Sequence, residues 1–327
     1  TRHVRDIAPC ATIEASSAVY FNDQTPGLWV PMIARAGVLL WDWPTKLEAV
    51  ALYLRNHSSV PQPIVLTLSH ARREPTWKSI DEYELVGRND LRDDAFEQIW
   101  KVTLELVPDY EGWFRVNLPP DVHLESKDAA SDDDRLLIAV GENRKVSWAL
   151  SSDRHKITEM VEQSHYCDEW RKVDAGPTVR LFPPPLLGDP ANITDGFHRR
   201  FSRGPTHMWM SDPEHDLPQD ITLSWTKPHT IDEIRITFDN LTELREDQPW
   251  ENGSRISPFL VKSYEVAFWD EKGWHELLQE TCNIHRFCKH SFMPIQTGKV
   301  RLRILATHGV GEPGRVYQVQ VMEALEI

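Results

Sequence analysis

Short segments in which apolar and polar residues alternate run through the whole chain, separated by proline, glycine and aspartate. In the first half the clearest is 98–107, where every second side chain from Trp100 onward is apolar, as in a strand that buries one face. The other strands predicted in this half are 37–41, 47–54, 64–68, 111–118, 136–140 and 146–150. Short strands at this spacing, with turn residues between them, are typical of an antiparallel β-sandwich.

The second half continues the same rhythm, with strands predicted at 231–238, 264–269, 300–304 and 316–323. Two short helices are also predicted, at 79–86 and 156–163. In the first of them, Asp81 and Glu82 fall in the opening turn, where carboxylates are favourable.

A proline-rich stretch divides the two halves. Pro183, Pro184 and Pro185 are consecutive, and such a run fits neither a central strand nor a helix interior. A chain of 327 residues also suits two domains. The predicted fold class is therefore all-β, with two tandem antiparallel β-sandwich (jelly-roll) domains at 1–175 and 188–327 joined by a Pro-rich linker at 176–187. The size and strand rhythm of the first domain also fit a second, diverged galactose-binding-like domain, although no repeated motif proves a duplication.

The segment 189–213 contains a turn signal, Asn192-Ile-Thr-Asp195-Gly196, then a basic loop, then Trp209-Met-Ser211-Asp-Pro213. This turn, followed by the strands of the second half, resembles the galactose-binding-like β-sandwich (the discoidin, or coagulation-factor type C, family) over roughly residues 186–327. The resemblance implies a domain that binds sugars or other surfaces and performs no chemistry itself.

In the family, sugar lies on loops at one end of the sandwich, and the matching loops here are 197–203, 239–257 and 307–315. The candidate ligand-binding residues on them are His198, Arg199, Arg200, Trp250, Asn252, His308 and Arg315. Guanidinium groups offer forked donors to hydroxyls or a carboxylate, and an indole ring stacks on a sugar face. The third loop lacks the aromatic that the family often places there, which argues against simple galactose binding.

Each of these assignments has an alternative. Arg199 and Arg200 equally suit pairing with local carboxylates on a solvated face, and His308 alone suits an ordinary loop histidine. Of the 13 tryptophans, Trp209 is predicted to lie in the core, and Trp225, Trp269 and Trp274 in the core or on a sheet face.

The resemblance also implies a structural calcium ion around the Asp-Gly turn, and Asp195 and Glu323 match the family's carboxylate ligands. Calcium takes about six to eight oxygens, and the sequence supplies only these two carboxylates. A metal-free turn closed by the Asp195 side chain fits the same residues.

Four cysteines are too few for a disulfide-built fold. Cys282 and Cys288 are close enough in sequence for a local bridge. The spacing Cys282, His285, Cys288, His290 could suit a zinc site, but an ordinary loop between strands is the favoured interpretation.

The net charge of −14 and pI of about 5.5 argue against a general nucleic-acid or anionic-membrane partner. No apolar run is long enough to span a membrane. Flavin- and nicotinamide-binding glycine motifs, a Walker loop, Gly-x-Ser-x-Gly and His-Glu-x-x-His are all absent from the sequence.

These observations favour a non-catalytic carbohydrate-recognition protein or accessory module, with a glycan as its partner. Two alternatives stay open. The whole chain also resembles the C-terminal accessory region of large bacterial FAD-dependent oxidoreductases, which would make a catalytic domain of the same larger protein its partner. A polysaccharide hydrolase or lyase would need two converging carboxylates, and sequence spacing does not identify such a pair.

Overall fold

The computed structural model describes residues 5–40, 43–44, 46–71, 90–92, 96–122, 124, 135–152, 158–163, 169–173, 176–185, 188–198, 207–240 and 256–324. The chain divides into two compact units. Unit 1 comprises residues 1–20, 186–200 and 205–327, and unit 2 comprises residues 21–185 and 201–204. Within the described residues both units are built from strands, as the all-β prediction states, and the only helices are short 3-10 turns.

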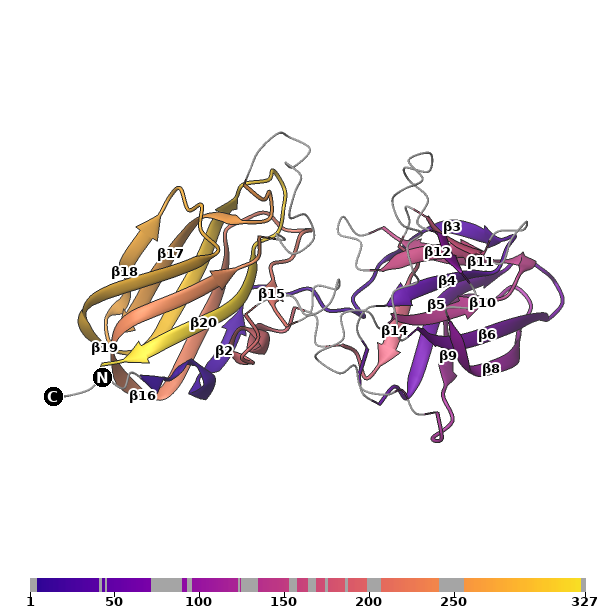
Figure 1. Ribbon diagram of the computed structural model, residues 1–327, viewed down its shortest axis with the longest axis horizontal. Coiled ribbons are helices and arrows are strands. Elements are labelled where there is room, and N and C mark those ends of the chain that lie inside the picture. The colour runs from indigo at the N-terminus through magenta and orange to yellow at the C-terminus, as the bar shows by residue number, and fades with distance from the viewer. Residues whose placement is uncertain are drawn as a thin grey trace. The chain divides into compact units, whose positions relative to one another are not determined.

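Unit 2 contains two antiparallel sheets (Figure 1). The seven-stranded sheet has the order β7 (Asp90–Arg92), β13 (Glu169–Val173), β12 (Glu159–Gln163), β4 (Ala36–Leu40), β10 (Arg135–Val140), β6 (Gln62–Ala71), β8 (Glu97–Leu106). The five-stranded sheet has the order β14 (Val179–Phe182), β5 (Ala49–Asn56), β11 (Asn143–Ser151), β3 (Pro26–Met32), with β9 (Glu111–Asn117) on the other edge of β5.

Alternate side chains of β5, including Val50, Leu52 and Leu54, are buried, so one face of the five-stranded sheet is turned to the core of unit 2. Trp148 on β11 is fully buried, and its indole Nε1 donates to the carbonyl of Thr178 at 2.8 Å. A buried indole N–H without an acceptor would be costly, so this bond fixes the ring. The opposite face of this sheet stays partly exposed.

Unit 1 is organised by two long bent strands, β16 (Gln219–Phe238) and β19 (Phe287–Thr307). Their pairing is interrupted between Ser224 and His229, where a bulge bends both strands. The other elements are β1 (Arg5–Asp6), η1 (Ala8–Cys10), β2 (Thr12–Ala15), η3 (Pro190–Thr194), β15 (Trp209–Met210), β17 (Val261–Asp270), β18 (Gly273–Glu280) and β20 (Arg315–Glu323).

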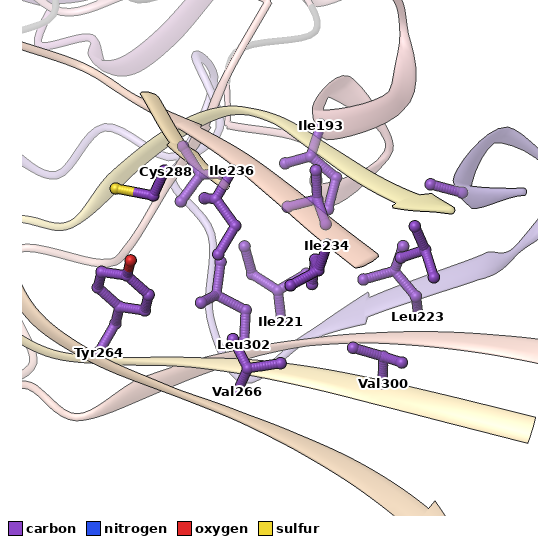
Figure 2. Close-up of a cluster of buried hydrophobic side chains, with 14 of the residues drawn as sticks. Ile193, Ile221, Leu223, Ile234, Ile236, Tyr264, Val266, Cys288, Val300 and Leu302 are labelled. Atoms are coloured by element: carbon purple, nitrogen blue, oxygen red, sulfur yellow. The ribbon is translucent and has the colours of Figure 1, made fainter. Parts of the chain in front are cut away.

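The bend creates two layers from continuous strands. Before it, β16 pairs with β2, and after it β16 pairs with β20. Ile221 and Leu302 from one layer and Ile234 and Ile236 from the other belong to a single buried cluster (Figure 2). The alternation of apolar residues along 231–238 and 300–304 is thus the signature of a sandwich core.

Residues 1–20 belong to unit 1, whereas the sequence analysis placed them in the first domain. β1 pairs with the end of β20, and β2 pairs with β16. Ile7 is buried in the core of unit 1, where its carbonyl accepts from the indole Nε1 of Trp225 at 2.9 Å. Unit 2 is therefore inserted between two segments that fold together, an arrangement that local pattern does not encode.

Two further expectations need correction. The predicted linker 176–187 includes β14, whose residues pair with β5 and whose Val179 and Leu181 are fully buried. The helix predicted at 156–163 is wrong over Glu159–Gln163, which form β12 because Met160 and Val161 both lie in buried positions between β4 and β13. The helix predicted at 79–86 lies outside the described residues.

Candidate functional site

Five loops of unit 1 meet at one end of its sandwich. The guanidinium Nη2 of Arg286 donates to the carbonyl of His198 at 2.7 Å, and the carbonyl of Arg286 accepts from the amide of Phe238 at 2.8 Å. The next amide, of Asp239, donates to the carbonyl of Arg315 at 3.2 Å. These contacts join the described parts of the loops that the sequence analysis selected at 197–203, 239–257 and 307–315.

Arg315 lies at the base of this loop end. Its side chain is 5% exposed, and its Nη1 lies 3.2 Å from Oδ2 of Asp239, whose side chain is 1% exposed. The guanidinium stacks on the ring of Phe259, 4.1 Å from the ring centroid. Because so little of Arg315 reaches solvent, it supports the loop end from beneath, rather than presenting the open fork expected from sequence.

Phe259 is an aromatic residue of this loop end that was not among the residues predicted from the sequence. It lies on the 256–260 segment, where its amide donates to Oγ of Ser257 at 3.3 Å, and its ring is half-buried. The family pattern directed attention to 307–315, which lacks an aromatic. Phe259 lies on a neighbouring loop, and only the tertiary structure shows that the two loops adjoin.

His308 is half-buried, and its ring is oriented by one hydrogen bond. Nε2 lies 2.7 Å from the carbonyl oxygen of Asn283, so Nε2 carries a hydrogen and donates it to that carbonyl. Its backbone amide donates to the carbonyl of Leu260 at 3.0 Å, and that of Gly309 donates to Pro258 at 2.7 Å. The loop carrying His308 is therefore held against the loop carrying Phe259.

Glu312 adds a titratable group to the same loop. Burial raises the pKa of its carboxyl, and the nearby positive charge of Arg315 opposes this shift. His198 is exposed and contributes its carbonyl to Arg286. Arg199, Arg200, Trp250 and Asn252 lie outside the described residues.

The two carboxylates expected to hold calcium are in different places. Asp195 accepts from the amide of Phe197 at 2.8 Å, and its Oδ2 lies 2.9 Å from Nδ1 of His207. Glu323 is the last residue of β20, and its Oε1 lies 2.8 Å from Nδ1 of His229.

The part of unit 1 near Asp195 leads into β15, which pairs with Arg315 and Val316 at the start of β20, whereas Glu323 closes the other end of that strand. Within the described ranges no three His, Cys, Asp or Glu side chains are grouped so that they could hold a metal ion. Asp195 and Glu323 therefore lie toward opposite ends of β20, and the structural calcium ion that the resemblance implies stays a prediction.

The bridge considered between Cys282 and Cys288 does not form, since both are free thiols. Cys288 is buried, its Sγ lies 3.3 Å from Oδ1 of Asn283, and burial raises the pKa of its thiol. Nearby, the hydroxyl of Tyr264 lies 2.7 Å from Nε2 of His290, and burial raises the pKa of Tyr264 and lowers that of His290. These groups are neutral at pH 7 and line the core, as expected for a structural cluster.

Trp209 is fully buried and confirms the prediction that it lies in the core. Trp269 and Trp274 face each other across β17 and β18 with ring centroids 5.5 Å apart. No helix in the described part of the chain is long and apolar enough to cross a membrane.

Comparison with known proteins identifies no family model and no curated protein that matches the sequence. Solved structures of carbohydrate-binding β-sandwich modules are similar to about two fifths of the chain. The family 32 carbohydrate-binding module of Streptococcus pneumoniae EndoD is 15% identical, covers 42% of this chain and 87% of that chain, and has a TM-score of 0.34.

The family 32 module of Clostridium perfringens NanJ, solved with galactose, is 18% identical over 42% of this chain and 86% of that chain, with a TM-score of 0.31. A chitosan-binding module of a Paenibacillus chitosanase/glucanase is 14% identical over 35% and 74%, with a TM-score of 0.27. At these identities and scores the likeness assigns no ligand and no site to this chain.

Proposed function

We propose that this protein is a non-catalytic carbohydrate-recognition protein or accessory module, and that unit 1 binds a glycan at its loop end. The observation that carries the proposal is that parts of all three loops selected from sequence meet there, through the contacts that run from His198 to Arg286, Asp239 and Arg315. Polar groups and an aromatic ring held by several loops at one end of a rigid sandwich are suited to orienting sugar hydroxyls.

The chemistry of the described side chains supports this role. The partly exposed Phe259 side chain adds apolar surface for the C–H face of a sugar, and Nδ1 of His308, the ring nitrogen not used in the contact with Asn283, can bond a sugar hydroxyl. The buried Asp239–Arg315 pair holds the two loops at their base. Few ligand atoms would be buried, so we expect affinities of roughly millimolar to micromolar.

Titration calorimetry of the full chain tests the proposal, with a panel of galactose, N-acetylgalactosamine, chitosan oligosaccharides and galacturonate oligomers. We expect at least one member to bind, and His308→Ala to weaken that binding about tenfold, which is the loss of roughly one hydrogen bond. Phe259→Leu keeps an apolar side chain and removes the ring, so it should weaken stacking.

His275→Ala is the matched control, because His275 is an exposed histidine on β18 that pairs with Asp270 at 2.9 Å. It should bind the glycan as the unaltered chain does. An absence of heat with every sugar would contradict the proposal, and so would equal losses in His308→Ala and His275→Ala.

A further inference from the structure

The outer face of the five-stranded sheet of unit 2 carries aromatic and arginine side chains in alternation. Three adjacent strands each place one of each kind two residues apart, and residues two apart on a strand share a face. This arginine–aromatic face is made of Tyr53 and Arg55 on β5, Trp113 and Arg115 on β9, and Arg180 and Phe182 on β14. All six side chains are at least partly exposed.

The strand register explains how the arginines lie. Arg115 on β9 and Arg180 on β14 are both paired with Ala51 of the central strand β5. The small side chain of Ala51 leaves room for both arginine stems to cross β5 in opposite directions. The Arg180 guanidinium lies 3.9 Å from the Trp113 ring centroid, and that of Arg115 lies 4.2 Å from the Phe182 ring centroid.

The remaining arginine of the face is neutralised, and these two are not. Arg55 stacks over Trp29 at 4.3 Å, and its Nε donates to Oε2 of Glu111 at 2.8 Å. Arg115 donates through Nε to the amide oxygen of Asn117, and Arg180 donates through Nε to the carbonyl of Asn22. In the described part of the chain, neither Arg115 nor Arg180 has a carboxylate partner.

Two arginines without carboxylate partners on one face are unusual in a chain whose net charge is −14. Each of the two guanidinium groups lies over a ring and donates through Nε, and among the described hydrogen bonds its terminal nitrogens stay available to a carboxylate or sulfate. The Arg180 guanidinium lies over a ring on β9 and that of Arg115 lies over a ring on β14, on opposite sides of β5, so the two can contact separate anionic groups of one extended chain.

We propose that the arginine–aromatic face binds a linear acidic polysaccharide. Carboxylate or sulfate groups contact Arg115 and Arg180, and a sugar ring packs against Tyr53, which lies edge-to-face with Trp113 at 5.4 Å between ring centroids. This second site is in unit 2 and does not rest on the glycan site proposed for unit 1.

The test measures binding of the full chain to three polymers by affinity electrophoresis and calorimetry at low salt. Polygalacturonate presents carboxylates, dextran sulfate presents sulfates, and dextran is neutral. We expect one or both acidic polymers to bind at least tenfold more tightly than dextran, and the difference to shrink as salt is raised, because exposed charges are screened.

Arg115→Gln and Arg180→Gln should each weaken binding of the acidic polymer at least fivefold. Arg144→Gln is the control, because it makes the same change of charge on β11 at an exposed arginine already paired with Glu142. Its affinity should stay within about twofold of the unaltered chain. The double variant Arg115→Lys and Arg180→Lys keeps both positive charges but loses the planar guanidinium groups. We therefore expect it to retain part of the affinity for the acidic polymer.

Equal binding to dextran and the acidic polymers would overturn the proposal. So would a loss of affinity in Arg144→Gln as large as that in Arg115→Gln or Arg180→Gln. Dimers that form with rising protein concentration and disappear in Arg180→Gln, without polymer binding, would show that a second copy of the chain covers the face instead. Failure of the calorimetric test on His308 concerns unit 1 and leaves the result here unaffected.

Discussion

Ile7 provides a direct test of the way the chain is divided, because it joins the core of unit 1 from the far end of the sequence. Its side chain is 1% exposed. Ile7→Ala removes about three carbon atoms, worth roughly 0.8 kcal/mol each on transfer, and leaves a cavity that adds to the loss. We therefore expect a cost of about 3 kcal/mol, within the usual range for buried Ile→Ala changes.

The backbone contacts of Ile7 survive the substitution, which isolates the side chain. Its amide still donates to Val321 and its carbonyl still accepts from Trp225. Hydrogen exchange measured by mass spectrometry reads each unit separately. A loss of about 3 kcal/mol should speed exchange in β16, β19 and β20 by roughly 100-fold, with no change in β5 or β10.

Ile284→Ala is the matched control, because this isoleucine of unit 1 is 54% exposed. A surface change of this kind should cost less than about 0.5 kcal/mol. If the two variants exchange alike, or if Ile7→Ala loosens unit 2, then the N-terminal segment does not fold into unit 1 and the division of the chain is wrong.

Gly188 has a φ of +72°, and a Cβ there would clash with the carbonyl oxygen of Val19. Gly188→Ala should therefore lower the denaturant midpoint by the equivalent of roughly 1–3 kcal/mol or more. Gly298→Ala meets nothing within 4 Å and should be nearly neutral; equal midpoints would contradict the reasoning. Burial lowers the pKa of His290, so the unfolded chain takes up that proton first and stability should fall as pH drops below about 6.5. His290→Gln keeps a partner for the Tyr264 hydroxyl and should flatten this decline between pH 7.5 and 5.5; an equally steep decline in the variant would exclude His290 as its source.

Most strands could be predicted from alternation, because a half-exposed strand repeats every two residues. The prediction at 111–118 corresponds to β9, and that at 316–323 corresponds to β20. Prediction from alternation failed over Glu159–Gln163, because charged residues flank Met160 and Val161 and the segment has no regular alternation. There, pairing with β4 and β13 decides the conformation.

The candidate site was predictable in part. The loops at 197–203, 239–257 and 307–315 came from resemblance to a known fold, and their described parts meet. The burial of Arg315 and the presence of Phe259 beside it were not predictable, since both depend on which loops adjoin. For the arginine–aromatic face a sequence signal did exist: aromatic and arginine occur two apart at 53–55, 113–115 and 180–182.

The order of apolar and polar residues is local information, and it was sufficient to establish that this chain is made of strands with turns between them. It could not show that residues 5–15 complete a sandwich whose other strands begin some two hundred positions later, nor that Ala51 lies between Arg115 and Arg180. Strand partners and register are chosen by which faces bury together across the whole chain, and no short stretch of sequence contains that choice.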